Sequence, residues 1–315
     1  MYPLMLKPIY DQTVWGRNRI PEIRGDKESG VGASWEISAH PYGSNVILNG
    51  ELKGMNLSEA IDAHEREILG KATKHDLLRC ALSDAKEGLS IQNHPTDAYA
   101  IPHDNDLGKT ESWYVIDAMP GATLMAGTKA QSKEEVLEAI KNKDIVYKME
   151  YHPVRPGDFI QIESGELHAL GGGITILEIA NNSNVTYRLY DYERTDANGN
   201  PRELHLKKGL DILNLDAKSK VLHHPTEERY ERETLISTPR YTVELMDIEG
   251  EKALYNEECF SVLHVVRGSG SLIYQGEEME LKYLQSLFIP ADCKEIIVKG
   301  DMRIIRAYPN IVKGE

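Results

Sequence analysis

The sequence predicts a mainly β protein with two β domains of the sandwich or barrel type. Most of the 315 residues fall into short runs of β-branched and aromatic residues that are separated by glycine, proline and asparagine. Short strands at this spacing, with few helical segments between them, favour a sandwich or barrel over an alternating βαβ sheet. The length fits two domains at about 150 residues per domain.

Strands are predicted along both halves of the chain. In the first half they are expected at 34–38, 45–49, 89–94, 112–117, 158–163, 173–179 and 185–190. In the second half they are expected at 241–246, 260–266, 271–274 and 287–290, with turns at Gly268, Gly270 and Gly276. The two β-rich halves could therefore share one architecture.

Helical patterns occur in three places. Apolar residues at helical spacing run from Leu57 to Leu69, with Ser58 as the candidate cap. The run from Ser132 to Glu135 is a capping box that opens a second helix. A third helix is expected over 203–213, after a turn rich in asparagine and glycine.

The stretch over 218–232 is polar and rich in charge, which indicates a connector. We therefore expect a larger domain over 1–217, with a helical insertion at about 55–88. A smaller β domain is expected over 218–315.

Composition limits the classes of partner. The chain carries 36 lysines and arginines against 50 acidic residues, a formal net charge of −14. This balance argues against nucleic acid as a partner, because affinity for nucleic acid comes mainly from basic side chains that neutralise phosphates. An anionic substrate would need a local basic pocket, since the overall field repels it.

Cysteine usage and hydropathy indicate the compartment. Cys80, Cys259 and Cys293 are an odd number without a Cys-x-x-Cys spacing, which fits a reducing environment. The N-terminus lacks the features of a secretory signal, and no apolar run reaches about 18 residues. We expect a cytoplasmic protein that does not associate with membranes.

Four candidate metal ligands lie in three separate segments. Gln92 and His94 are two residues apart, so they project from the same face if the segment is a strand. Glu111 begins an aromatic, β-prone run, and His168 lies in an apolar context between glycine turns. Each alone has an ordinary interpretation: a polar strand end, a surface carboxylate, a core histidine. Together they form a nitrogen-and-oxygen set suited to zinc or another first-row divalent ion.

Two basic side chains accompany these candidates. Lys109 would share a face with Glu111 in an extended segment, and a surface ion pair between them is the simple alternative. Arg188 lies between hydrophobic neighbours of a predicted strand, where an unpaired guanidinium is costly. It implies either an anionic ligand or a structural ion pair with Asp191 or Glu193.

The motifs, taken in order, resemble those of the type I phosphomannose isomerases in their short bacterial form. The resemblance covers residues 1 to about 215 well and the rest weakly. It depends on Val-Trp-Gly at 14–16, Ser-Trp-Glu-Ile-Ser-Ala-His at 34–40, Ser-Ile-Gln-Asn-His-Pro at 90–95, Gly-Lys-Thr-Glu at 108–111, Pro-Gly-Asp at 156–158, Gly-Glu-Leu-His-Ala at 165–169, Thr-Tyr-Arg-Leu-Tyr-Asp-Tyr at 186–192 and Pro-Arg-Glu-Leu-His at 201–205. It implies two cupin (jelly-roll) β domains, with the metal in the N-terminal one.

The resemblance also implies roles for individual residues. One zinc ion per chain would be held by Gln92, His94, Glu111 and His168. The sugar-phosphate pocket would be lined by Ser90 and Lys109, Arg188 would be the catalytic arginine, and Glu178 matches a pocket glutamate of longer members. Asn184 stands where an aspartate is frequent, so that aspartate does not supply the general base here.

The implied activity is the metal-dependent interconversion of mannose 6-phosphate and fructose 6-phosphate through a cis-enediol. Glu178, Lys109 or a water on the metal are the candidates for the base. The partner would be a small sugar phosphate, and the chain is expected to be a monomer or a weak homodimer. Two alternatives stay open: another cupin metalloenzyme, or a cupin that senses sugar phosphates without catalysis.

Overall fold

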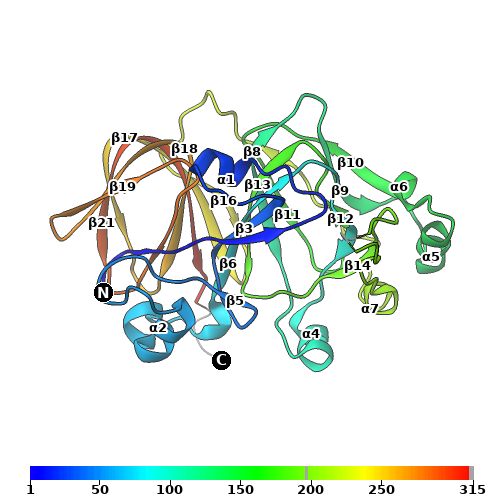
Figure 1. Cartoon of the computed structure of the whole chain (residues 1–315), viewed down its shortest axis with the longest axis horizontal. Coiled ribbons are helices and arrows are strands. Elements are labelled where there is room, and N and C mark those ends of the chain that lie inside the picture. The colour runs from blue at the N-terminus through cyan, green and yellow to red at the C-terminus, as the bar shows by residue number, and fades with distance from the viewer. Residues whose placement is uncertain (196–197, 312–315) are drawn as a thin grey trace. The chain divides into compact units, whose positions relative to one another are not determined.

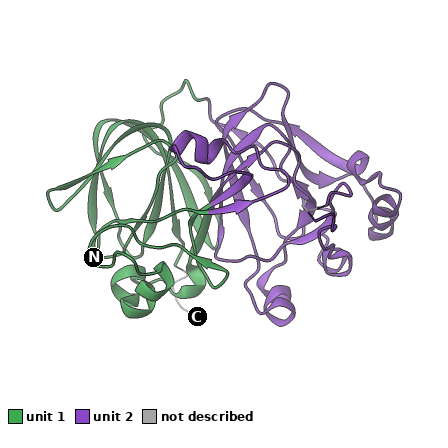
Figure 2. Cartoon of the chain, viewed as in Figure 1, with its two compact units in different colours: residues 1–9, 35–80, 226–315 green, residues 10–34, 81–225 purple. Residues whose placement is uncertain are grey.

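The computed structural model describes residues 1–195 and 198–311 (Figure 1). Its residues form two compact units, each assembled from segments that are distant in the sequence (Figure 2). The first unit comprises Met1–Ile9, Trp35–Cys80 and Thr226–Glu315, and the second comprises Tyr10–Ser34 and Ala81–Pro225. These units group residues by contact in space, whereas the expected boundary at 217/218 is a division along the sequence and stays a prediction.

The second unit contains two facing sheets. The five-stranded sheet has the order β10 (Met149–Pro153), β9 (Thr123–Thr128), β12 (His168–Ala169), β7 (Ile91–Asn93), β14 (Tyr187–Tyr190). The seven-stranded sheet has the order β15 (Leu222–His223), β11 (Asp158–Ile162), β8 (Glu111–Ala118), β13 (Ile174–Asn181), β6 (Leu78–Ala85), β3 (Val31–Ile37), β2 (Ile9–Gln12).

Alternating side chains fill the space between these sheets. Trp113 and Val115 of β8 and Ile160 of β11 share one buried cluster with Leu124 and Ala126 of β9. The intervening residues of the five-stranded sheet point to its other face, where they pack against helix α5. This alternation is the two-residue period of a sandwich whose inner faces are both buried.

Five helices lie in the described part of the second unit. They are α1 (Arg19–Arg24), α4 (Asp97–Asp104), α5 (Lys133–Lys141), α6 (Ile145–Lys148) and α7 (Leu206–Asp211). The predicted cap of α5 is confirmed, because Ser132 Oγ accepts a hydrogen bond from the Glu135 amide at 3.1 Å. The helix expected over 203–213 is shorter, since its first residues form the loop that leads to α7.

The first unit contains a long-stranded antiparallel sheet. Its order is β1 (Leu4–Met5), β20 (Ser286–Ile289), β18 (Ser261–Tyr274), β21 (Glu295–Pro309), β17 (Tyr241–Tyr255), β16 (Glu233–Ser237), with β19 (Glu277–Leu281) paired to β18. The first unit also contains a two-stranded sheet, formed by β4 (Ala39–His40) and β5 (Gly43–Ser44). Its helices are α2 (Leu57–Ala63), α3 (Glu65–Leu69) and the 3₁₀ helix η1 (Lys74–Asp76).

Several local predictions were wrong in informative ways. The turn expected at Gly268 and Gly270 is absent, because β18 runs through both residues along β21. A Cβ atom at either glycine would lie 2.1 Å from a carbonyl oxygen of β21, so glycine permits close strand approach there rather than a turn. The segment 45–49 forms only isolated bridges instead of a strand.

The helical insertion also differs from its prediction. Helix α2 is capped by Asn56, in a capping box with Glu59, and not by Ser58. The last helix of this region, η1, ends at Asp76. The buried strand β6 begins at Leu78, so it occupies part of the range 55–88 that was expected to be helical. The mainly β fold class is nevertheless confirmed, and the strands pair antiparallel in β1–β20, β8–β11, β8–β13, β17–β21 and β18–β21.

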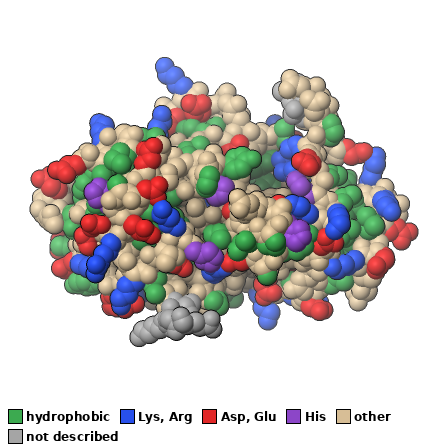
Figure 3. Space-filling view, turned by 90° about the horizontal axis from the view of Figure 1, so that it is seen from below, with side chains coloured by type: hydrophobic (Ala, Val, Ile, Leu, Met, Phe, Trp, Pro, Cys, Tyr) green, Lys and Arg blue, Asp and Glu red, His purple; other side chains and the backbone are tan. Residues whose placement is uncertain are grey.

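Further sequence expectations concern the surface and the cysteines. Cys80, Cys259 and Cys293 are all buried free thiols. None of the helices in the described part of the chain has the length and apolar character that a membrane crossing needs. On the face shown in Figure 3, acidic and basic side chains are interspersed.

Candidate active site

Three of the predicted site residues form a row across the five-stranded sheet. Gln92 on β7 is the register partner of His168 on β12 and of Arg188 on β14. Register partners share a face of a sheet, so the three side chains stand side by side. Ile91 and Ala169, the neighbours along the strands, lie in the cluster on the opposite face. The row therefore faces the space between the two sheets.

The acidic candidates project into the same space from the seven-stranded sheet. Glu178 on β13 is the register partner of Trp113 on β8, and Glu111 lies two residues before that tryptophan. Trp113 belongs to the cluster between the sheets, and its ring packs edge-on against His168 at 5.6 Å between centroids. Strand alternation thus places Glu111 and Glu178 opposite the polar row.

Three potential metal ligands converge there. Ligand atoms of His94, Glu111 and His168 all lie within 4.8 Å of one another, and all three residues are buried. The Nε2 atoms lie 3.5 Å (His94) and 3.2 Å (His168) from Oε1 of Glu111. None of these three atoms has a hydrogen-bond partner among the described residues. Such convergent, buried and unpartnered atoms fit a bound divalent ion, whose charge would satisfy all of them.

Backbone carbonyls orient both imidazole rings. The Nδ1 atom of His94 lies 2.8 Å from the Val185 carbonyl, and that of His168 lies 2.9 Å from the Glu166 carbonyl. If each Nδ1–H donates to its carbonyl, each Nε2 lone pair points into the cluster, which is the usual arrangement around a metal. Burial, together with the charge of Lys109, lowers the pKa of His94 to about 4, so its ring is neutral near pH 7.

Lys109 connects the candidate metal centre to Glu178. Its Nζ atom lies 2.5 Å from Oε2 of Glu111 and 2.8 Å from Oε1 of Glu178. Burial alone would raise the pKa of Glu111, but Lys109 and His94 outweigh it and hold that pKa well below its usual range. The predicted pairing of Lys109 with Glu111 exists, but it is buried and not a surface ion pair.

Ser90 connects the arginine to the predicted ligands. Its Oγ accepts a hydrogen bond from Nε of Arg188 at 3.3 Å and donates one to Oε1 of Gln92 at 3.1 Å. Nη1 of Arg188 donates to the Glu203 carbonyl at 3.0 Å. Burial and the neighbouring charge of Arg202 lower the pKa of Arg188, as expected for a cation without a close anionic partner.

The structural ion pairs considered for Arg188 are not formed among the described residues. Asp191 binds Arg194 and Arg202 instead, at 2.6 Å and 2.5 Å. The carboxylate of Glu193 pairs with Lys143. This leaves Arg188 in a locally basic group, which supports the alternative of an anionic ligand.

Some contacts that shape the site carry no side-chain signal in the sequence. The carbonyls of Val185 and Glu166 orient the histidines, yet any residue supplies a carbonyl, so no side-chain signal marks them. Asn184 is held by its backbone N–H, which donates to Asp106 at 3.0 Å. Gln92 stands beside His168 in the sheet, and its role as a fourth ligand stays a prediction.

Fold and site together define a class: a β-sandwich enzyme with a buried histidine–glutamate–histidine centre and adjacent basic residues for an anionic substrate. Two family models match the chain: "Phosphomannose isomerase type I, catalytic domain" over residues 4–112, and "Mannose-6-phosphate isomerase, cupin domain" over 231–309.

Relatives match over nearly the whole chain. Mannose-6-phosphate isomerase of Streptococcus mutans is 36% identical, covering 98% of each chain. Mannose-6-phosphate isomerase ManA of Bacillus subtilis is 35% identical, covering 95% of this chain and 96% of the relative. The crystal structure of mannose 6-phosphate isomerase from Bacillus subtilis superposes with a TM-score of 0.90 at 34% identity, covering 98% of this chain and all of that one. The chain belongs to the type I mannose-6-phosphate isomerase family, and the cupin architecture expected from the sequence is confirmed.

Proposed function

We propose that the protein interconverts mannose 6-phosphate and fructose 6-phosphate at the site between the two sheets of its second unit, with one divalent metal ion bound by His94, Glu111 and His168. The convergence of three buried, unpartnered ligand atoms carries this proposal. Membership of the family supports the reaction, and the convergence of these side chains supports this location for it.

Zinc is the proposed ion. Two imidazole nitrogens and a carboxylate oxygen, with the Gln92 amide oxygen as a fourth ligand, form a set that suits zinc. A mannose 6-phosphate isomerase of the same fold, 16% identical, has been solved with bound zinc and yttrium. When bound, the ion supplies Lewis-acid polarisation of the sugar oxygens.

Side chains of the protein would stabilise the developing negative charge and orient the substrate. Aldose–ketose isomerisation moves a proton between C1 and C2, and the enediol that forms carries developing negative charge on its oxygens. We assign stabilisation of this charge to Lys109 and Arg188, because fixed cations act strongly in a site that excludes water. Ser90, which bonds Arg188, would help to orient the sugar phosphate.

We propose Glu178 as the base that carries the proton. It faces the space between the sheets, and Lys109 holds its Oε1 atom at 2.8 Å. Lys109 is the poorer candidate, because its ammonium group is held between two carboxylates and has no lone pair to accept a proton.

A basic surrounding explains how so acidic a protein could attract a phosphate. Arg194 and Arg202 lie close enough to Arg188 to influence its charge, as do the carboxylates of Asp191 and Glu203. The three guanidiniums therefore exceed these two negative charges by one. We propose that the phosphate of the substrate binds on this side of the site.

A coupled assay tests the proposal. Fructose 6-phosphate formation from mannose 6-phosphate is followed before chelation, after chelation and after addition of zinc. We expect activity that is lost to the chelator and restored by the metal. An inert zinc-loaded protein, with other sugar phosphates also unconverted, would contradict the isomerase proposal and favour a sensing role.

Two further proposals concern the state of the protein in the cell. We propose a cytoplasmic location, which the three buried free thiols support. We also propose a monomer or weak homodimer, and light scattering over a concentration series would decide between them.

A further inference from the structure

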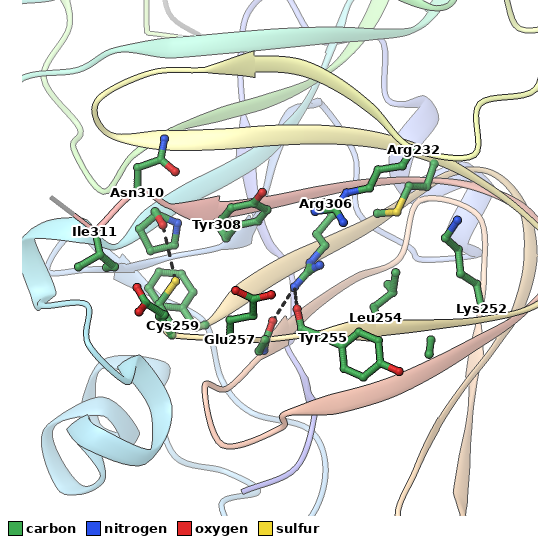
Figure 4. Close-up of a pocket in the computed structure, with 16 residues that line it drawn as sticks. Arg232, Lys252, Leu254, Tyr255, Glu257, Cys259, Arg306, Tyr308, Asn310 and Ile311 are labelled. Atoms are coloured by element: carbon green, nitrogen blue, oxygen red, sulfur yellow. Dashed lines mark hydrogen bonds between the residues drawn. The ribbon is translucent and has the colours of Figure 1, made fainter. Parts of the chain in front are cut away.

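A second cavity lies entirely within the first unit, apart from the residues assigned to the isomerase reaction. It has a volume of about 560 Å³ and is lined mainly by strands β17 and β21 and by the segment 256–260 that follows β17 (Figure 4). Its apolar walls come from Met246, Leu254, Tyr255, Phe260 and Tyr308. Both the volume and the mixed lining are typical of small-molecule sites.

Arg306 of β21 projects into this cavity as a buried cation. Its residue is only 7% exposed, yet it makes no ion pair with any described residue. The nearest acid on the neighbouring strand, its register partner Glu244, is bound by Arg232 at 2.6 Å and by the Tyr308 hydroxyl at 3.1 Å. These bonds all go to Oε1 of Glu244, so Glu244 acts on Arg306 through its charge and not through a direct ion pair.

The guanidinium is held in a fixed orientation by neutral groups. Nη2 of Arg306 donates to the Tyr255 carbonyl at 2.6 Å and to Oδ1 of Asn256 at 2.8 Å (Figure 4). Asn256 is in turn fixed by a hydrogen bond from Ser261 and by its own donation to two carbonyls. In the described residues, Nε and Nη1 of Arg306 have no acceptor. One side of a pre-oriented guanidinium fork is thus left for an anion.

We propose that this cavity is a binding site for a small molecule that carries a carboxylate or phosphate group, with Arg306 as its anchor. Burying a cation without a direct ion pair is costly, and a bound oxyanion reduces that cost. The apolar walls call for a ligand with an apolar or ring-shaped body next to its anionic group. Cys259 also lines the cavity, but burial raises the pKa of its thiol to about 11, so the site binds its ligand without thiolate chemistry.

Two rim residues should modulate the affinity in opposite directions. Lys252, which is half-buried, and Glu257, which is exposed, line the cavity from β17 and the turn that follows it. Removal of the positive charge in Lys252→Gln should weaken anion binding, and removal of the negative charge in Glu257→Gln should strengthen it. Both changes should be modest, about two- to threefold, because solvent reaches both charges and screens them.

Isothermal titration of the metal-loaded full chain with benzoate and with phenyl phosphate tests the proposal, and the two probes distinguish a carboxylate from a phosphate ligand. Arg306→Gln should weaken binding of the preferred probe by about tenfold or more. Because the guanidinium also bonds the backbone at Tyr255, Arg306→Gln could destabilise the fold. If its melting temperature falls, the decision moves to the two rim variants, of which Glu257→Gln changes an exposed side chain.

Matched controls separate this cavity from the isomerase site. Lys282→Gln changes an exposed lysine of the same unit that does not line the cavity, and binding should stay unchanged. Arg188→Ala should also leave it unchanged. Binding that disappears with Arg188 but survives loss of Arg306, rim variants without opposite effects, or absence of binding by either probe at millimolar concentration would each overturn the proposal.

Discussion

The Nζ atom of Lys109 lies 2.8 Å from Oε1 of Glu178, and this buried contact joins the residues before strand β8 to strand β13. Lys109 also contacts Glu111, which contributes to the candidate metal centre. One ammonium group therefore lies between the acid that would hold the metal and the acid proposed to carry the proton. This arrangement couples the metal centre to the proposed base.

Lys109→Met should lower kcat by about a hundredfold or more, because it removes a fixed cation from the reacting oxygens and the partner of Glu178. Glu178→Gln should have a comparable effect. If the two residues act as one unit, the double variant should be little worse than the worse single variant. Metal content, measured by plasma mass spectrometry, should stay at one ion per chain, and a near-normal kcat in either single variant would exclude its proposed role.

Arg188→Ala should lower turnover by about a hundredfold or more while zinc stays bound, because the guanidinium is placed to stabilise charge on the substrate. Arg188→Lys should restore only part of the activity, since an ammonium does not reproduce the two-pronged contact. Steady-state kinetics with mannose 6-phosphate is the measurement. Turnover close to that of the unchanged protein in Arg188→Ala would rule the assignment out.

Gln92→Ala should weaken zinc binding by about ten- to a hundredfold, which is the usual effect of losing one supporting contact of a metal site. Gln161→Ala is the matched control, because Gln161 lies on β11 between Ile160 and Ile162, which face the inner cluster, and so points to the other face. Competition with a chromogenic chelator gives both affinities. Equal affinities would remove Gln92 from the ligand set.

Much of the candidate site could be predicted from the sequence because its residues follow strand periodicity. The spacing of Gln92 and His94 predicted that the two side chains share a face, and Glu111 at the start of an aromatic run was a candidate to face either a ligand or solvent. The mainly β class followed from the many short runs of strand-type residues separated by turn residues. The resemblance to a family added the roles, which no periodicity contains.

The remaining features depend on contacts between distant segments. The burial of Lys109 requires β13 to pair with β8, which brings Glu178 to it, and no local pattern specifies that pairing. Gly268 and Gly270 do not form the expected turn, because they allow β18 to pack closely on β21, a strand that is distant in the sequence. The lack of a direct ion pair at Arg306 likewise depends on the fold, because its cross-strand partner Glu244 binds Arg232 instead.

The free energy of unfolding should depend on pH through His264. This histidine belongs to the first unit, and the proposed metal ligands belong to the second. It is 2% exposed, its Nδ1 atom lies 2.7 Å from Oγ of Ser286, and burial lowers its pKa to about 3. The unfolded chain binds a proton at this histidine below about pH 6.5, whereas the folded chain does so only below about pH 3. Its contribution is therefore complete above pH 6.5 and is lost as the pH falls from there toward 3, by about 1.4 kcal/mol per pH unit.

Urea unfolding at pH 6.5 and pH 4.5 measures this dependence. The fall in the free energy of unfolding between these values should be smaller in His264→Gln than in the unchanged protein by about 2–3 kcal/mol. Because the other titrating groups are the same in both proteins, the difference between the two falls isolates the contribution of His264. An equal fall in both proteins would show that His264 does not cause the pH dependence.

Asp247 should be the critical carboxylate of the first unit. Its oxygens accept hydrogen bonds from Nε and Nη2 of Arg303, at 2.9 and 2.8 Å, and from Nη2 of Arg267 at 2.8 Å. Burial would raise the pKa of Asp247, but these partners outweigh it and lower that pKa. Arg303 is only 1% exposed, so Asp247→Asn leaves a buried guanidinium without its counter-charge and should cost about 3–5 kcal/mol of stability.

Asp301→Asn is the control, because its pair with Arg229 is exposed and should contribute little. Thermal unfolding of both variants is the measurement, and equal melting temperatures would show that the Asp247 network does not stabilise this unit.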